Sequence, residues 1–348
     1  MNENGINNAS DIRQEKVACP VCGDNGPFES LGVVNDYVML RCNKCYLEFA
    51  ESMRYDPGYY ENIHYAEDEN LKDILALSRR DFLNRASKLI HSINWQPQNI
   101  IFKWIGNNIK QGSTILDIGC GVGWFIAALE SVHFRAIGIE VSTNVVNMLK
   151  NKGFELYLGP IEQIDKNIPA PDLITLLAVI EHVKSPIDLL KDIRNRFPNA
   201  KLMVSIPSPK RWDLNVIGER TYCEYPPNHL TPSWSENTLK IALEKAGFRL
   251  AEWLYPPPIA DEMWFIYIDW LLLRIGLRKK GYFVGLTNKA VKSDNILSII
   301  INIFYPLIEK FMLLAKYAAR PLLSSFAEKL RKEGYSGLTA VALAYPVK

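Results

Sequence analysis

The stretch from Thr114 to Glu140 decides the fold. It begins Thr-Ile-Leu-Asp-Ile-Gly-Cys-Gly-Val-Gly-Trp-Phe and ends Ala-Ile-Gly-Ile-Glu. Its first five residues form a short, mostly apolar run, which predicts a buried parallel strand. Glycines at alternate positions of 119–123 follow at once, so the chain can turn tightly and a ligand can approach bare backbone. A helical pattern over 125–133 then leads to a second strand over 135–141, and the helix N-terminus points at any ligand held by the glycines.

The spacing of these glycines distinguishes between two nucleotide ligands. The dinucleotide motif Gly-x-Gly-x-x-Gly would place its last glycine at position 124, where this chain has Trp124. Asp117, inside the first strand, would repel a diphosphate but suits a ligand that carries an ammonium group. Both features argue against a nicotinamide oxidoreductase. From the residues alone, the alternative is a glycine turn in an α/β domain that binds no cofactor.

Residues 117–123 resemble the first motif of class I S-adenosylmethionine-dependent methyltransferases. The resemblance implies a doubly wound, Rossmann-like α/β fold whose seven strands lie in the order 3-2-1-4-5-7-6. It also implies that the aspartate and the loop hold the methionine part of S-adenosylmethionine, and that the acid ending the second strand takes the ribose hydroxyls. Ile161 is expected against the adenine, although Pro160 stands where many relatives carry an acid. The cofactor-binding residues carried over are Asp117, Gly119, Gly121, Glu140 and Ile161.

Two later segments resemble loops of the same family and carry histidines. The fourth strand is expected over 172–180 and leads into Glu181-His182-Val183, and a substrate loop with His229 precedes a helix that begins near Ser235. Strand ends of such sheets face the ligand, and a histidine there can take a proton near neutral pH. We therefore predict His229 as general base, with His182 as second candidate and Glu181 beside it. Local hydrogen bonds that only hold the loops are the alternative.

Four of the six cysteines form two pairs, Cys19-Pro-Val-Cys22 and Cys42-Asn-Lys-Cys45, with 19 residues between the pairs. This spacing predicts a structural zinc ribbon with four thiolate ligands. Disulfide bonds are the alternative. They are disfavoured because the polar N-terminus lacks the basic and apolar residues of a secretion signal. The same N-terminus predicts a cytoplasmic protein.

The charge of the ribbon bears on its partners. Residues 16–60 carry four basic and six acidic side chains, a net charge of −2 that is the wrong sign for a phosphate backbone. A small-molecule acceptor is therefore expected, and nucleic acid is not. The segment Tyr55-Asp-Pro-Gly-Tyr59-Tyr60 resembles one that follows the ribbon in bacterial small-molecule methyltransferases. It predicts Tyr59 and Tyr60 in the substrate pocket, with packing of the ribbon onto the core as the alternative. Tyr222 is expected there too, because it belongs to the loop with His229 that resembles the substrate loop of the family.

The late part of the chain is basic and apolar. Residues 274–332 hold twelve basic and three acidic side chains, and the longest uncharged run there, 295–308, has 14 residues. That run is shorter than the roughly 20 residues that span a bilayer. A basic, apolar helical segment suits an anionic membrane surface. The alternative is a helical lid or a homodimer contact.

With 348 residues, 48% of them hydrophobic and 22% charged, the chain is globular and long enough for several units. The predicted units are a mobile tail over 1–15, the zinc ribbon over 16–60, a helical linker over 61–112, the methyltransferase core over 113–255, a helical insertion over 256–335 and the last core strand over 336–348.

The expected activity is transfer of the sulfonium methyl group to an oxygen or carbon of a small acceptor. A sugar, a nucleotide-linked sugar or a lipid-linked or quinone-like compound would serve as acceptor. The alternative is a zinc-ribbon binding module with a catalytically inactive methyltransferase fold, which would show no affinity for S-adenosylmethionine.

Overall fold

The structure is a computed structural model, and it describes residues 17–54, 69–92, 94–164, 167–218, 224–274 and 296–347. Three residues predicted in the substrate pocket, Tyr59, Tyr60 and Tyr222, lie outside these ranges. So do the expected tail over 1–15 and residues 275–295 of the predicted insertion.

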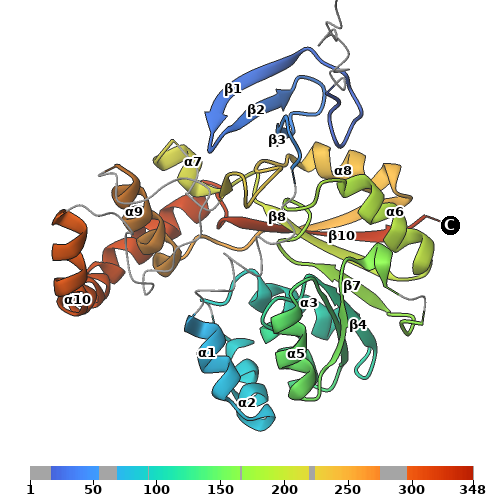
Figure 1. Cartoon of the computed structure of the whole chain (residues 1–348), viewed down its shortest axis with the longest axis horizontal. Coiled ribbons are helices and arrows are strands. Elements are labelled where there is room, and N and C mark those ends of the chain that lie inside the picture. Colours follow the sequence, from blue (N-terminus) through green and yellow to red (C-terminus); the bar gives the residue numbers. More distant parts are fainter. Residues whose placement is uncertain are drawn as a thin grey trace, which may run out of the picture.

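The N-terminal part is a three-stranded antiparallel sheet with the strand order β1-β2-β3. Its strands are β1 (Phe28–Val34), β2 (Tyr37–Cys42) and β3 (Glu48–Ala50). Asn35 and Asp36 join β1 to β2 with φ angles of 49° and 65°. Two successive left-handed residues suit a hairpin because their twist matches that of the strands, and Asn and Asp tolerate this conformation best after glycine. This small sheet lies above the main sheet, next to α8 (Glu236–Lys245) (Figure 1).

The main sheet has seven strands in the order β6-β5-β4-β7-β8-β10-β9. They are β4 (Thr114–Ile118), β5 (Arg135–Glu140), β6 (Glu155–Leu158), β7 (Leu173–Leu176), β8 (Lys201–Pro207), β9 (Phe248–Leu254) and β10 (Thr339–Pro346). The first five strands in this order pair in parallel, and β10 is antiparallel to both of its neighbours. Numbered along the chain from β4, the order is 3-2-1-4-5-7-6, so the predicted fold class and strand order are confirmed.

Two hydrophobic clusters cover the two faces of this sheet, and alternate residues of the strands enter each of them. One face carries α1 (Glu69–Ala76), α2 (Arg79–Leu89), α3 (Gln98–Asn108), α4 (Trp124–Ser131) and α5 (Thr143–Asn151). The other carries the short helix η2 (Ile161–Gln163), α6 (Pro186–Arg196) and α8, and buried residues of the ribbon join this second cluster. The ribbon therefore shares a core with the main domain.

The fourth core strand is shorter than its apolar run predicts. Expected over 172–180, β7 ends at Leu176, so its last four residues were wrongly predicted as strand. The reason is Ala178, which has a φ of 55° and donates its N–H to Ser205 Oγ at 2.7 Å. This turn brings Val179 over the glycine loop, where a Cβ added to Gly119 would lie 2.6 Å from Val179 Cγ2. A residue larger than glycine has no room at position 119.

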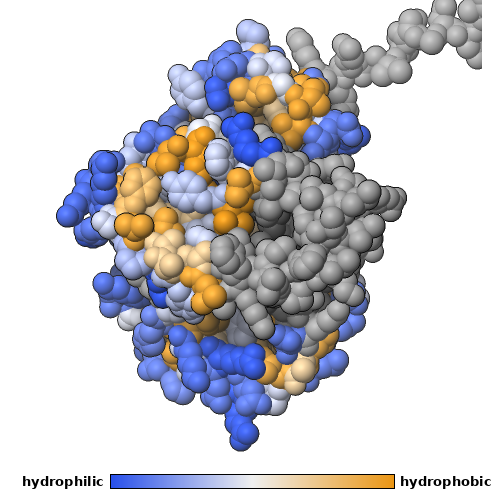
Figure 2. Space-filling view, turned by 90° about the vertical axis from the view of Figure 1, so that its left-hand side faces the viewer, coloured by the Kyte–Doolittle hydropathy of each residue, from blue (hydrophilic) through white to orange (hydrophobic). Residues whose placement is uncertain are grey.

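At the other end of the molecule, α9 (Ala260–Arg274) packs against α10 (Ile296–Lys332), and α7 (Trp212–Val216) joins them in a third cluster (Figure 1). Figure 2 faces this end, and apolar residues reach the surface there among hydrophilic ones. Leu314 and Leu322 of α10 are well exposed. In the part of the chain that the structure describes, no helix is both long and apolar enough to cross a membrane. Contact of this region with a membrane surface or a second copy stays a prediction.

Candidate active site

The loop between β4 and α4 makes a tight turn that is held against the end of β5. Gly119, Gly121 and Gly123 have φ angles of 74°, 53° and 86°, a region that favours glycine. The N–H groups of Gly119 and Cys120 both donate to the carbonyl oxygen of Ile139 in β5, at 2.8 and 3.0 Å. Gly123 occupies the N-cap of α4 and has no side chain to cap it. The first N–H groups of the helix can therefore bind a ligand.

Asp117 ends up buried beneath this loop, near the carboxyl end of β4. Thr175 Oγ1 in the neighbouring strand β7 donates a hydrogen bond to Asp117 Oδ1 at 2.6 Å. Burial raises the pKa of Asp117 to about 7, with the nearby charge of Glu140 adding to the effect and the Thr175 bond opposing it. A buried acid whose pKa is raised is stabilised in its ionised form when a cation binds beside it. The site therefore fits the ammonium group that the sequence led us to expect.

Glu140 lies at the carboxyl end of β5 and is also buried. Its Oε2 accepts the N–H of Gly121 at 2.9 Å, and its Oε1 accepts the N–H groups of Val141 at 2.8 Å and Ser142 at 3.1 Å. Ser142 is the N-cap of α5, so this carboxylate ties the glycine loop to the start of the next helix. The sequence placed Glu140 beside the loop but did not reveal this structural role.

Ile161 begins the helix η2 after β6. The turn that leads to it lies beside β5, because the N–H of Gly159 donates to the carbonyl oxygen of Glu140 at 2.9 Å. The Ile161 side chain is only 1% exposed and belongs to the core on this face of the sheet. It has little surface to offer, and this weighs against the predicted contact with adenine.

The two candidate bases lie against each other, although 47 positions separate them in the sequence. The rings of His182 and His229 meet edge-on, with centroids 4.5 Å apart and an interplanar angle of 84°. His182 Nδ1 lies 2.7 Å from the carbonyl oxygen of Asn228. Because a carbonyl oxygen only accepts, we assign the proton to Nδ1, and in the neutral ring Nε2 then carries the lone pair. His182 thus braces the residue next to His229.

Glu181 completes this group. Its carboxylate and the two imidazole rings offer atoms that all lie within 4.8 Å of one another, close enough to surround one cation. The side chain is buried, and none of the described residues donates a hydrogen bond to its Oε2. Burial raises the pKa of Glu181 to about 8, and the charge of Glu224 adds to the effect. The structure therefore brings together the three residues predicted as catalytic.

The four paired cysteines also come together. The Sγ atoms of Cys19 and Cys45 lie 3.6 Å apart and those of Cys22 and Cys42 lie 3.5 Å apart, and none of the four is in a disulfide bond. Sulfurs bound to tetrahedral zinc at about 2.3 Å would be about 3.8 Å apart. The hydrogen bond between Cys45 and Cys19 lowers the pKa of Cys19 and raises the pKa of Cys45, so in the absence of a metal these two thiols share one proton. The cluster fits zinc and gives no support to the disulfide alternative.

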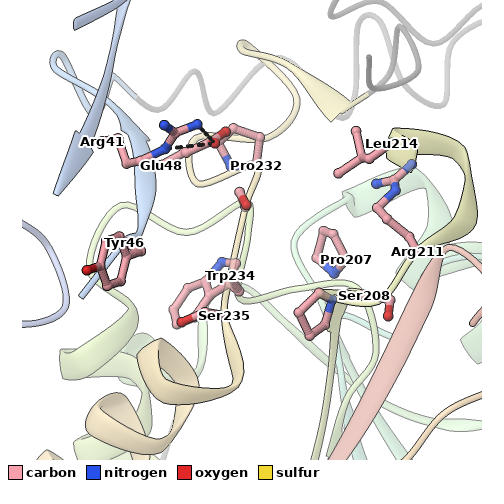
Figure 3. Close-up of a pocket in the computed structure, with 12 residues that line it drawn as sticks. Arg41, Tyr46, Glu48, Pro207, Ser208, Arg211, Leu214, Pro232, Trp234 and Ser235 are labelled. Atoms are coloured by element: carbon pink, nitrogen blue, oxygen red, sulfur yellow. Dashed lines mark hydrogen bonds and ion pairs between the residues drawn. The ribbon is translucent and has the colours of Figure 1, made fainter. Parts of the chain in front are cut away.

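A cavity of about 320 Å³ lies between the ribbon and the carboxyl end of β8 (Figure 3). On the ribbon side, Arg41 and Glu48 form an ion pair at 2.8 Å; on the far side lies Arg211, buried between Asp213 and Glu224. The remaining lining is a mixture of hydroxyl, aromatic and apolar side chains: Tyr46, Pro207, Ser208, Pro209, Leu214, Pro232, Ser233, Trp234 and Ser235. Sequence reasoning missed this cavity, because its walls come from segments far apart in the chain.

Comparison with known proteins identifies a methyltransferase domain in this chain. Residues 90–252 match a family model described as "Methyltransferase domain". Among curated proteins, the ubiquinone biosynthesis O-methyltransferase of Coxiella burnetii is 29% identical over 136 residues, which is 36% of this chain and 56% of that protein. The tRNA U34 carboxymethyltransferase of Campylobacter jejuni is 29% identical over 159 residues, which is 43% of this chain and 53% of that protein. This chain thus spans about half the length of the curated relatives it matches.

Among solved structures, a SAM-dependent methyltransferase from Archaeoglobus fulgidus is 18% identical, with a TM-score of 0.42, over 71% of this chain and 93% of that chain. The family match covers β4, the glycine loop, both strand-terminal acids and the histidine pair. Residues 90–252 of this chain thus match a methyltransferase domain, and the main sheet has the strand order expected of class I S-adenosylmethionine-dependent methyltransferases.

Proposed function

We propose that this protein transfers the methyl group of S-adenosylmethionine to an oxygen or carbon of a small acceptor. The observation that carries the proposal is the pair of buried acids, Asp117 and Glu140, which flank the glycine loop at the carboxyl ends of adjacent parallel strands. Ligands of doubly wound sheets bind at this edge. The bound cosubstrate supplies a methyl group on a sulfonium, already a good electrophile. The chain's own residues align the two reactants and accept one proton.

The acceptor site is the cavity between the ribbon and β8. Residues 232–235 form part of its wall and begin three positions after His229 in the chain, so the proposal places the reacting end of the acceptor toward that residue. Its hydroxyl groups and the Arg41–Glu48 pair suit a polar acceptor such as a sugar or a nucleotide-linked sugar. The net charge of −2 on residues 16–60 argues against a nucleic-acid backbone. A screen for radiolabelled methyl transfer to sugars, nucleotide-linked sugars, phenols and transfer RNA tests this choice.

The metal proposed for the four cysteines is zinc, held by Cys19, Cys22, Cys42 and Cys45. With all four positions filled by sulfur, the ion would have no open site for a substrate, so its role would be structural. Elemental analysis of freshly purified protein should find one zinc per chain.

Replacing Glu140 by alanine should weaken S-adenosylmethionine binding by roughly 1–3 kcal/mol, the size of a charge-assisted hydrogen bond. Calorimetry measures this loss. Because Glu140 also holds Gly121, a second ligand is needed to separate the two effects. An S-adenosylhomocysteine analogue without ribose hydroxyls should bind the wild type more weakly than the parent ligand, whereas Glu140→Ala should not distinguish the two. Equal discrimination by both proteins would contradict a contact between Glu140 and the ribose.

The affinity for S-adenosylmethionine should rise with pH until about pH 7. In the ligand-free protein the pKa of Asp117 is about 7, so below that pH the carboxyl group is protonated and must lose its proton when a cation binds. The affinity should therefore grow by up to about tenfold per pH unit below pH 7. Calorimetry in buffers of different ionisation enthalpy should detect the released proton. Asp117→Asn should remove both the slope and the proton release; persistence of either would exclude Asp117 as their source.

The second candidate function is a zinc-ribbon binding module with an inactive methyltransferase fold. This candidate predicts no affinity for S-adenosylmethionine, whereas the first candidate predicts that the protein binds it. Calorimetry with the wild-type protein decides between them.

A further inference from the structure

We propose that the N-terminal ribbon holds the segment 226–233 in the geometry that the reaction needs, and that Asn35 is a positioning residue for His229. We call residues 226–233 the histidine segment. The inference rests on the proposed function, since it takes His229 as the base. The ribbon lies in a different sheet from the cosubstrate site, and under this proposal it nevertheless affects the rate of methyl transfer.

The ribbon bonds to both ends of the histidine segment. At its start, Asn35 Nδ2 donates to the carbonyl oxygen of Pro226 at 2.7 Å. Further along, the N–H of Ala50 donates to the carbonyl oxygen of Leu230 at 2.9 Å, and the N–H of Glu48 donates to that of Ser233 at 3.2 Å. The segment therefore runs along the edge of β3, and His229 lies between the contacts at its two ends.

The main domain holds the middle of the same segment. His182 Nδ1 donates to the carbonyl oxygen of Asn228, and the N–H of Thr231 donates to the carbonyl oxygen of Glu181 at 3.1 Å. Buried backbone groups need hydrogen-bond partners. The N–H groups of Asn228 and His229 donate to the carbonyl oxygen of Tyr225 in a local turn, and the other partners named here come from two separate units. The position of His229 thus depends on how the ribbon sits on the main domain.

The place of the ribbon on the main domain is set by the two cysteine knuckles, residues 19–22 and 42–45, which contact α8. The carbonyl oxygen of Cys45 accepts the hydroxyl of Thr238 at 2.6 Å. At the other end of α8, Lys245 Nζ donates to the carbonyl oxygens of Val21 at 2.9 Å and Cys22 at 2.7 Å. The metal would fix the shape of both knuckles and, through α8, the place of the ribbon.

The experiment compares two aspartate substitutions in the ribbon. Asn35→Asp keeps the size of the side chain and its tolerance of a positive φ, but it replaces the donor to Pro226 with an oxygen. Asn43→Asp is the matched control, because Asn43 Nδ2 donates to the carbonyl oxygen of Pro27 at the same 2.7 Å but entirely within the ribbon. Both variants add one negative charge. Zinc content and S-adenosylmethionine affinity are measured first and should equal those of the wild type.

Two measurements that need no acceptor then follow. Amide hydrogen exchange in the histidine segment should speed up about fivefold to tenfold in Asn35→Asp and less than twofold in Asn43→Asp, as expected for the loss of one hydrogen bond. The chain has only five histidines, so the ring of His229 can be followed by nuclear magnetic resonance. Its resonances and its titration should change in Asn35→Asp alone.

Turnover, with any acceptor found in the methyl-transfer screen, should fall about tenfold in Asn35→Asp with little change in KM. Wild-type exchange and wild-type histidine resonances in Asn35→Asp would overturn the proposal, and so would equal effects of the two variants. If instead His229→Ala retained full turnover, the proposed base would be wrong, while the exchange data would still report whether the ribbon holds the segment.

Discussion

Replacing His229 by alanine is expected to lower turnover by about 10²–10⁴-fold, the usual contribution of a general base. The affinity for S-adenosylmethionine should stay nearly unchanged, because His229 lies on the segment after β8 and not among the residues around the glycine loop. His229 is 9% exposed and its ring contacts that of His182, so it lies in a sheltered site. Initial rates at saturating S-adenosylmethionine, together with calorimetry, measure both quantities.

The contact between the two histidine rings makes His182 the necessary comparison. If His182 only braces Asn228, the variant His182→Asn should turn over within a few-fold of the wild type, because the asparagine amide can donate in place of Nδ1. His182→Ala lacks that donor and should lose more. A collapse in His182→Asn, with a nearly intact His229→Ala, would reverse the assignment of the base. The double variant should be no worse than His229→Ala alone, since residues in one network are not additive.

The parts of the fold that the sequence predicted are those whose signals are local. The run 114–140 holds a strand, a turn and a second strand within reach of one another, and its glycine spacing excluded a dinucleotide motif. The cysteine pairs are equally local, since each knuckle needs only four residues. The strand order followed from the family resemblance and not from the residues alone.

What the sequence could not show depends on contacts between distant segments. Asn35 and Pro226 are 191 positions apart, and neither carries a pattern that points to the other. The early end of β7 was missed for a different reason: Leu177 to Ile180 are as apolar as a strand, and the positive φ of Ala178 and its hydrogen bond to Ser205 become visible only in the structure. The second role of Glu140 was hidden likewise, because its bonds to backbone N–H groups leave no trace in side-chain types.

Removing the zinc proposed for the four cysteines is expected to unfold the ribbon while the main sheet persists. The described ribbon, residues 17–54, has fewer than 40 residues, a size at which a fold usually needs a metal, disulfides or a partner. Structural zinc sites contribute roughly 10 kcal/mol or more, and four neighbouring sulfurs without a metal would have no comparable attraction. Among the residues that the structure describes, none of the ribbon enters the core on the α1–α5 face, so that side of the sheet has its own support.

The variant Cys42→Ser tests this expectation, with Cys223→Ser as a control for the loss of a thiol outside the cluster. In Cys42→Ser, zinc should be lost and amide exchange in β1, β2 and β3 should approach that of an unfolded chain. Turnover should fall at least tenfold, because the histidine segment loses its partners in β3, whereas S-adenosylmethionine should bind within a few-fold of the wild type. The opposite pattern, a protected ribbon and full turnover in protein shown to be free of metal, would mean that packing against Trp234 and Leu239 suffices to hold the ribbon.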